Sequence, residues 1–220
     1  MALLDFARGP ALTFALVVFL IGTLWRLVGV LALPWRRIPS PPREGAPPAF
    51  LAALQGVFGK MVPHKTFMNG AGAFTIINGY VFHIGLAIVV FAFAPHILFI
   101  KHMFGVSWPA LPSGLIYAVG ALTTASLVAA LAQRMTSPVL KVISRLDDYI
   151  SWLMTFLPVV TGLLAVSHLG ARYETLLAIH ILSICAFFVW FPFGKLMHAF
   201  LFVVSRGATG VRFRHRGAEI

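Results

Sequence analysis

Five long apolar runs constrain this 220-residue chain more than any other feature of its sequence. The length of each run meets the requirement for a helix that crosses a bilayer, which takes roughly 17–25 residues. We therefore predict an all-α integral membrane protein with five spans, in which residues 1–220 form one membrane domain. The runs cover residues 11–33, 76–100, 114–131, 149–166 and 176–204.

The composition agrees with a membrane protein and disfavours a nucleic-acid-binding one. Hydrophobic residues make up 60% of the chain and charged residues only 10%, whereas soluble domains carry about 25% charged residues. The formal net charge is +11, but the basic residues are scattered between apolar runs and form no stripe on one face. We therefore expect membrane lipid around the chain and no nucleic acid partner.

The distribution of Lys and Arg predicts the orientation of the spans. These residues are frequent in the first and third connections and in the tail, and scarce in the second and fourth connections. Because loops rich in Lys and Arg stay in the cytoplasm, five spans place the N-terminus outside and the C-terminus in the cytoplasm. The expected location is the inner (cytoplasmic) membrane of the cell. The basic residues of the rich segments are Arg36, Arg37, Arg43, Lys60, Lys65, then Arg134, Lys141, Arg145, then Arg206, Arg212, Arg214 and Arg216.

The first connection, residues 34–75, is a cytoplasmic loop that divides into two parts. Its first part, PWRRIPSPPREGAPP, is rich in Pro and basic residues, which predicts an extended segment. The second part, AFLAALQGVFGKMV, has apolar residues near helical spacing and predicts a short amphipathic helix. Such a helix could lie on the cytoplasmic membrane surface or dock a partner subunit, and both interpretations stay open.

Histidines inside two of the apolar runs are the candidate ligands. His83 and His96 lie on the second run, His180 and His198 on the fifth, and His102 follows the second run closely. The 18 residues between His180 and His198 equal five helical turns, so one unbroken helix would present both on one face. In the predicted topology, His83 and His198 share the cytoplasmic half of the bilayer, and His96 and His180 the outer half. Two such pairs predict two bis-histidine b haems.

The partner of His180 is less firmly assigned than that of His198. His83 and His96 are 13 residues apart, which corresponds to roughly 220° of rotation on a straight helix. Pro95 introduces a kink that makes this angle unreliable. His96 is therefore the preferred second ligand, and His102 remains the alternative.

The cysteine content restricts how a haem could be held. The chain has one cysteine, Cys185, and no CxxCH attachment motif. Any haem must therefore be bound through axial ligands and not through thioether bonds.

Basic residues near the histidines are candidates for the haem propionates and the quinone. Lys195 lies three residues before His198 and is the first propionate candidate, followed by Arg206 and Arg145. Lys101, His102 and Trp108 could line a quinone site beside the outer haem. A topology-setting role for the cations and an interfacial role for Trp108 remain the alternatives.

Three segments resemble a known family. FHIG (82–85), RMTSPVLKVISRLDD (134–148) and HILSICAFFVWFPFGKLMH (180–198) are similar to the gamma subunit of membrane-bound respiratory nitrate reductase, a dihaem cytochrome b family. The resemblance covers residues 76–206. It implies that His83 and His198 ligate the haem nearer the cytoplasm, and that His180 and a second histidine on the second span ligate the other.

The chain also departs from that family. The family has its second histidine ten residues after the first, and here that position, 93, is phenylalanine. The segment VSWPALPSGL lacks the lysine that the family associates with quinol. These differences suggest a relative that serves a different catalytic partner.

The resulting functional expectation is an electron-transfer subunit without catalytic residues of its own. It would pass electrons between the quinone pool and a cytoplasmic iron–sulfur or molybdenum-type oxidoreductase through one or two b haems, with two more favoured. The alternatives are a haem-free membrane anchor and a histidine-lined transporter subunit. The transporter is disfavoured because the six Asp and Glu residues all fall outside the predicted spans.

Overall fold

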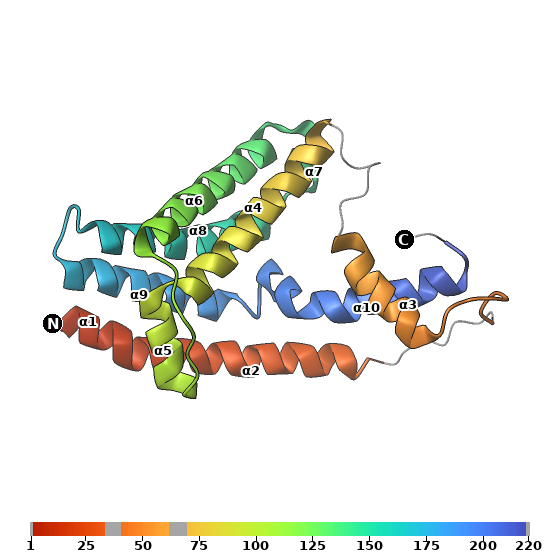
Figure 1. The fold of residues 1–220 in the computed structure, drawn as a ribbon, viewed down its shortest axis with the longest axis horizontal. Helices are drawn as coiled ribbons and strands as arrows, with labels where there is room; N and C mark the ends of the chain where they lie inside the picture. Colours follow the sequence, from red (N-terminus) through yellow and green to blue (C-terminus); the bar gives the residue numbers. More distant parts are fainter. Residues whose placement is uncertain (1, 34–40, 62–69, 219–220) are drawn as a thin grey trace.

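The computed structural model describes residues 2–33, 41–61 and 70–218, and within these ranges every regular element is a helix (Figure 1). The prediction of an all-helical chain is confirmed. The elements in chain order are α1 (Ala2–Phe6), the π-helical turn η1 (Ala7–Ala11), α2 (Leu12–Leu31), α3 (Ala49–Phe58), the 3-10 turn η2 (Gly59–Met61), α4 (Gly70–Ala92), α5 (Ala94–Phe104), α6 (Ser113–Thr136), α7 (Pro138–Ile143), α8 (Leu146–Ser167), α9 (Tyr173–Trp190), the 3-10 turn η4 (Lys195–Met197) and α10 (His198–His215).

Five of the described helices are long and apolar enough to cross a membrane, which indicates a multi-pass membrane protein. A helix satisfies its backbone groups internally where no water is present, which explains why these apolar runs are helical. The first helix begins nine residues before the apolar run that starts at residue 11, because η1 accommodates Pro10 within a continuous helix. The five helices are Ala2–Leu31, Gly72–Ala92, Ser113–Thr136, Leu146–Ser167 and Tyr173–Trp190.

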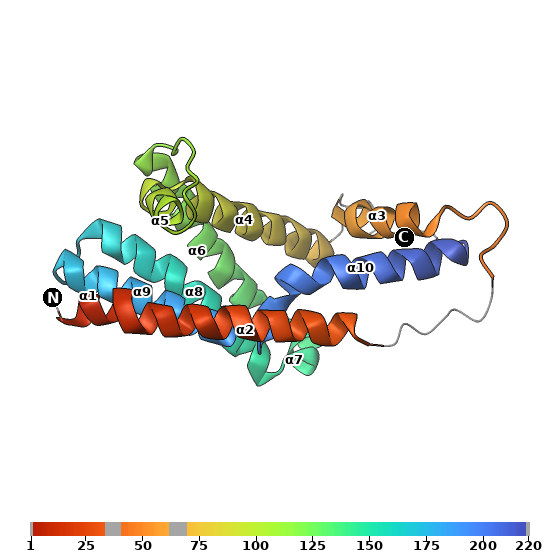
Figure 2. The ribbon, with the colours of Figure 1, turned by 90° about the horizontal axis from the view of Figure 1, so that it is seen from below.

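The long helices pack in the order α4, α6, α8, α9 and α2 (Figure 2). Polar side chains join neighbours in this row. Asn78 of α4 donates to the Ser126 carbonyl of α6 over 3.0 Å, and the Trp190 indole of α9 donates to Ser151 Oγ of α8 over 3.0 Å. Each such bond between membrane helices contributes about 0.6–2 kcal/mol. The N-terminus and the α8–α9 connection lie at one end of the molecule, and α3 and the end of α10 at the other (Figure 1).

The second apolar run, residues 76–100, forms two helices where we expected one span. α4 ends at Ala92, Phe93 is extended with φ −84° and ψ 128°, and α5 begins at Ala94 and turns away from α4 (Figure 1). Pro95 lacks the N–H that would continue the α4 hydrogen-bond pattern, and its ring clashes with the preceding turn. The kink expected at Pro95 is thus a complete break.

The fifth run, residues 176–204, is also divided, and the expectation of one helix with His180 and His198 on one face is wrong. α9 ends at Trp190, and His198 is the first residue of α10. Pro192 lies in the turn between them, where it packs so closely on α2 that a Cβ at Gly22 would be 2.7 Å from Pro192 Cγ. A proline in that turn cannot continue the α9 hydrogen-bond pattern, so α10 begins as a separate helix.

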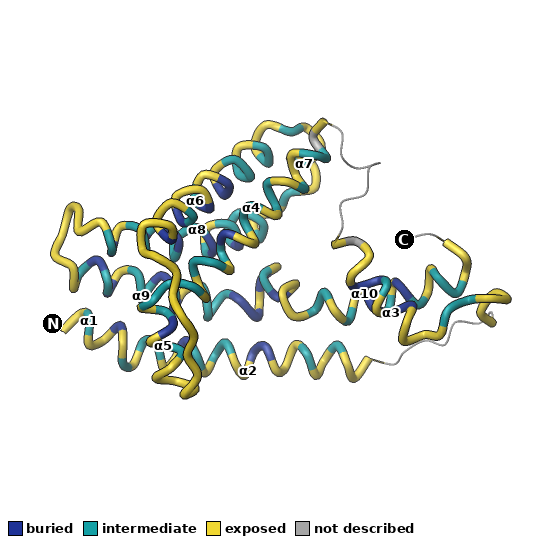
Figure 3. Tube along the Cα trace, viewed as in Figure 1, coloured by how far each residue is buried: buried dark blue, intermediate teal, exposed yellow. Residues whose placement is uncertain are grey.

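The segment expected as a short amphipathic helix forms α3, followed by η2, and it packs on α10; residue 62 and the neighbouring positions up to 69 lie outside the described residues. The two helices cross at glycines, since a Cβ at Gly56 would lie 2.6 Å from Gly210 Cα. Figure 3 shows this crossing as buried positions at the end of the molecule farthest from the N-terminus. The opposite face of α3 is exposed, with Phe50 at 76% and Phe58 at 57% of full accessibility.

Candidate functional site

Four of the predicted histidines meet in two pairs. The ring centres of His83 on α4 and His198 on α10 are 6.3 Å apart, with the ring planes at 83°. The ring centres of His96 on α5 and His180 on α9 are also 6.3 Å apart, with the planes at 22°. The structure therefore brings together the same pairs that shared a predicted depth, although the helix between His180 and His198 is broken.

The imidazoles of the His83–His198 pair are both oriented by backbone carbonyls. His83 Nδ1 lies 2.7 Å from the Gly79 carbonyl oxygen, one helical turn earlier, and His198 Nδ1 lies 2.7 Å from the Lys195 carbonyl oxygen. A carbonyl oxygen only accepts hydrogen bonds, so both Nδ1 atoms carry the proton. The lone pair of each ring is therefore on Nε2, the atom farthest from the backbone.

The His96–His180 pair shows the same pattern. His96 Nδ1 lies 2.9 Å from the Val89 carbonyl oxygen. His180 Nδ1 lies 3.2 Å from Thr161 Oγ1, whose hydroxyl donates to the Leu157 carbonyl over 2.7 Å and so can accept from the imidazole. All four rings thus have Nδ1 engaged, and the three that face a carbonyl oxygen have Nε2 left as an acceptor. Ligating histidines in metalloproteins typically make this second hydrogen bond.

The geometry of each pair suits a metal ion held between two imidazoles. An imidazole nitrogen binds a metal at about 2 Å, so two rings on opposite sides of one ion have centres about 6 Å apart. A porphyrin supplies four further nitrogens, and two axial imidazoles complete the coordination of its iron. Among the described residues there is no group of three or more His, Cys, Asp or Glu side chains that could hold a bare metal ion.

The two pairs differ in how far they are exposed. His83 and His198 are both exposed even though their rings approach each other, and His96 and His180 are half-buried. At the second pair, a Cβ at position 162 would lie 3.1 Å from His180 Cε1, so glycine there leaves room for the imidazole against α8. Each pair nevertheless brings two imidazole donors together at the same ring-centre distance of 6.3 Å.

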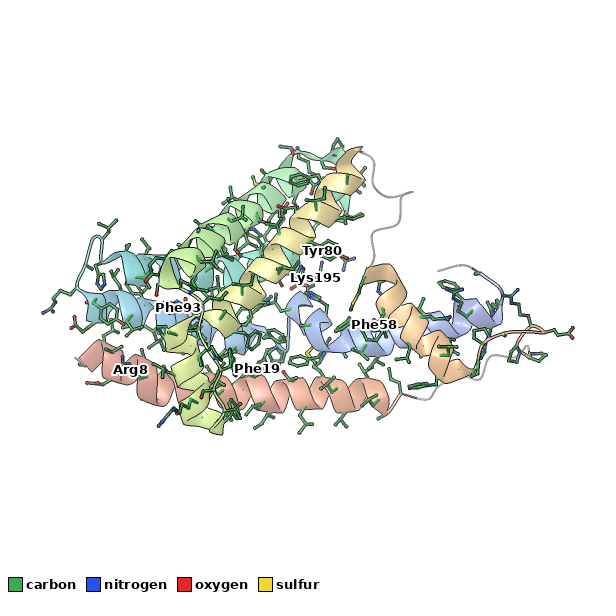
Figure 4. All side chains as sticks on the ribbon, in the orientation of Figure 1. Arg8, Phe19, Phe58, Tyr80, Phe93 and Lys195 are labelled. Atoms are coloured by element: carbon green, nitrogen blue, oxygen red, sulfur yellow. The ribbon has the colours of Figure 1, made fainter. Side chains whose placement is uncertain are left out.

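Of the three predicted propionate cations, Lys195 is tied to the His83–His198 pair through its carbonyl, which bonds His198 Nδ1. Lys195 Nζ is 2.6 Å from Asp148 Oδ2. Arg145 and Arg206 are exposed. Lys195 is labelled in Figure 4 on the segment that leads into α10.

The predicted quinone-site residues lie beyond the break that separates α4 from α5. Lys101 and His102 are exposed on α5, and it is His96, and not His102, whose ring is paired with His180. The Trp108 indole N–H donates to the Phe91 carbonyl over 2.5 Å. Trp108 therefore contacts the end of α4 directly.

Sequence reasoning missed the residues that support the histidines. Asp148 was placed outside the fourth span, but α8 begins at Leu146, so Asp148 lies in its first turn and bonds both Arg134 and Lys195. An acidic residue three positions after the N-cap is typical of a helix start, so Asp148 could have indicated that α8 begins after Arg145. Thr161 had no signal, because a threonine inside an apolar run is common in membrane helices.

Comparisons with known proteins reveal one extended similarity. No family model matches the chain, and no solved structure matches it. The chain is 31% identical over 211 residues to a protein of Nitratidesulfovibrio vulgaris (strain Hildenborough), a match that covers 94% of this chain and 92% of that protein. The description of that protein, "Protein", names no activity. The chain therefore belongs to the same family as this Nitratidesulfovibrio vulgaris protein.

Proposed function

We propose that the chain is a membrane cytochrome b subunit that passes electrons between the quinone pool and a cytoplasmic oxidoreductase partner. The observation that supports this most is the pairing of four histidines at two places, each pair with ring centres 6.3 Å apart. Every ring also has its Nδ1 engaged in a hydrogen bond with the protein. An incidental contact between two histidines would not require this orientation in all four rings.

The proposed roles of the residues follow from the two pairs. His83 and His198 would hold one b haem, and His96 and His180 a second. Bound haem supplies one-electron chemistry by cycling between the ferric and ferrous states. The two sites would lie on successive helices, with His83 on α4 and His96 on α5. Their proposed partners likewise lie on separate helices, His180 on α9 and His198 on α10. The backbone carbonyls and Thr161 orient the rings, and this second hydrogen bond makes each imidazole a stronger ligand.

The orientation and the partners belong to the same proposal. The pattern of basic residues favours an N-terminus outside the inner membrane and a C-terminus in the cytoplasm. The His83–His198 site would then be nearer the cytoplasm, where Lys195, Arg145 and Arg206 are candidates for the propionates. The partner would be an iron–sulfur or molybdenum-type oxidoreductase that docks on the cytoplasmic side.

Quinone would bind on the opposite side, next to the His96–His180 site. Lys101 and His102 are exposed on α5, five and six residues after His96, and could contact a quinone carbonyl oxygen. The indole N–H of Trp108, the third candidate, is already engaged by the Phe91 carbonyl.

A difference spectrum tests the function. Protein produced with haem available and purified in detergent should give the reduced-minus-oxidised spectrum of low-spin b haem. A reduced quinol analogue added to membranes should produce the same spectrum. A colourless preparation would instead favour a haem-free membrane anchor or a histidine-lined transporter.

Two alanine variants test the choice between His96 and His102. We expect His96→Ala to lose one haem, because its ring is the one paired with His180. His102→Ala serves as the matched control and should keep both haems. A loss in the control with no loss in His96→Ala would reverse the assignment.

A further inference from the structure

The break between α4 and α5 leaves carbonyl groups at the end of α4 without their helical donors. In a continuous helix the Phe91 carbonyl would accept from the N–H of residue 95, but Pro95 has none. The Trp108 indole N–H takes this position at 2.5 Å. The Ala92 carbonyl accepts instead from the Leu111 N–H over 2.9 Å. The segment that follows α5 thus supplies the donors that the break removes.

The same break determines which residue reaches the Val89 carbonyl. His83 shows how a histidine inside the helix is held, with Nδ1 bonded to the carbonyl four residues earlier. On an unbroken α4, the side chain that could reach the Val89 carbonyl in this way would belong to position 93, which is phenylalanine. In the structure His96 Nδ1 makes this bond at 2.9 Å, seven residues after Val89.

The break therefore changes the direction in which the His96 side chain points relative to that of His83. On a straight helix the two would differ by roughly 220° and would face different directions. Because the chain turns at Phe93, the imidazole of His96 folds back along the last turn of α4 and approaches His180. The ring of Phe93 packs edge-on against it, with ring centres 5.3 Å apart.

We infer that Trp108 is a positioning residue for the His96 ligand. Its indole N–H holds the end of α4 in the broken form, and the broken form directs the His96 imidazole to the Val89 carbonyl and to His180. The inference rests on the proposed haem-binding function and goes beyond it, because it assigns a role to a residue that touches neither the haem iron nor His96 in this scheme.

The first experiment removes the indole N–H and keeps an aromatic ring. We expect Trp108→Phe to retain haem at the His96–His180 site about tenfold less well, as for other residues that support a ligand. Trp25→Phe is the matched control, because Trp25 is 72% exposed on α2, and it should leave both haems unchanged. Retention of the haem at the His83–His198 site would show that the variant is folded.

The second experiment moves the ligand back onto a continuous helix. Pro95→Ala alone should let α4 continue and lose the second haem, because His96 then rotates away from His180. The triple variant Phe93→His/Pro95→Ala/His96→Ala should regain that haem, since position 93 on a continuous helix reaches the Val89 carbonyl. The readouts are haem per polypeptide and the low-temperature absorption bands of the two haems.

The outcomes separate this inference from the proposed function. A wild-type protein without haem would contradict the proposed function itself. Two haems in the wild type, with no effect of Trp108→Phe on the second, would overturn the role of Trp108. If Trp108→Phe loses both haems, the second experiment decides, and a triple variant that does not regain the second haem overturns the inference.

Discussion

The four paired histidines share one local pattern, in which Nδ1 is hydrogen-bonded to the protein and Nε2 is the iron ligand in the proposed scheme. Backbone carbonyls accept from three of the rings, and the Thr161 hydroxyl is the hydrogen-bond partner of His180 Nδ1. The identity of the four histidines could be predicted from their places in the apolar runs. The acceptor of His83 lies one turn earlier on the same helix and follows from helical spacing. The partners of the other three rings could not be predicted, because each depends on a turn or a neighbouring helix whose geometry the sequence leaves open.

The Thr161 hydroxyl provides a test at this scale. Thr161→Val keeps the shape of the side chain and removes the acceptor for His180 Nδ1. The imidazole then donates less electron density to iron, so we expect a more positive midpoint potential for the second haem. A potentiometric titration followed by absorbance measures the shift.

Thr124→Val is the control for this prediction, because the Thr124 hydroxyl bonds only its own helix, at the Gly120 carbonyl. It should leave both potentials unchanged. Equal potentials in Thr161→Val and the wild type would contradict the role given to Thr161.

At the scale of elements, Asp148 links three parts of the fold near the start of α10. Its carboxylate is 3.3 Å from Arg134 at the end of α6 and 2.6 Å from Lys195 on η4, and it accepts from the Arg145 N–H over 2.9 Å. The Lys195 carbonyl in turn orients His198. Asp148 therefore fixes the turn from which the first residue of α10 extends.

Removing this charge should weaken the fold moderately. Asp148→Asn keeps the size of the side chain and loses both ion pairs, and the partly exposed partners limit the loss to about 1–2 kcal/mol of stability. For a chain of this size that lowers Tm by roughly 3–6 °C. Thermal denaturation in detergent measures it.

Asp147→Asn is the comparison for this variant, because Asp147 lies in the same first turn of α8 and contacts Ser151 Oγ at 3.4 Å. We expect a Tm near that of the wild type. If both variants were equally stable, the linking role of Asp148 would be wrong.

The crossing of α3 and α10 can be tested with a disulfide. A Cβ placed on Gly207 would be 3.7 Å from Ala53 Cβ, and disulfides have Cβ atoms about 3.8 Å apart. Ala53→Cys/Gly207→Cys, with Cys185→Ser, should therefore form an internal disulfide on mild oxidation. Intact mass after alkylation would detect it.

The control for the disulfide is Ala49→Cys/Gly207→Cys, in which one cysteine lies a turn away along α3. It should stay reduced under the same conditions. Equal yields from both pairs would mean that α3 does not hold a fixed register on α10.

The five apolar runs were enough to predict five membrane-length helices, but not where those helices break. Periodicity and hydropathy treat residues 176–204 as one helix, because the turn at residues 191–194 is itself apolar. Pro192 and Gly194 were the available signal, and only their packing against Gly22 and Trp190 shows that a turn forms there. At Pro95 the sequence predicts a kink. The hydrogen bond from Trp108 to the Phe91 carbonyl could not be predicted, because Trp108 lies on a separate segment.

At the scale of the whole molecule, we expect two connecting segments to lie on opposite sides of the membrane. The proposed topology places the α8–α9 connection on the outer side of the membrane and α7 on the cytoplasmic side. Leu169 of that connection and Val142 of α7 are 70% and 86% exposed. With Cys185→Ser as background, we expect a membrane-impermeant thiol reagent to label Leu169→Cys in intact cells, and Val142→Cys only after the membrane is opened. The reverse pattern would invert the orientation.

The central claim is that one chain holds two haems, each between two histidines. Haem per polypeptide, measured as the pyridine haemochrome together with amino-acid analysis, tests this most directly. We predict two haems in the wild type, one in His198→Ala, one in His180→Ala and none in the double variant. Unchanged haem content in both single variants, or no haem in the wild type, would contradict the account.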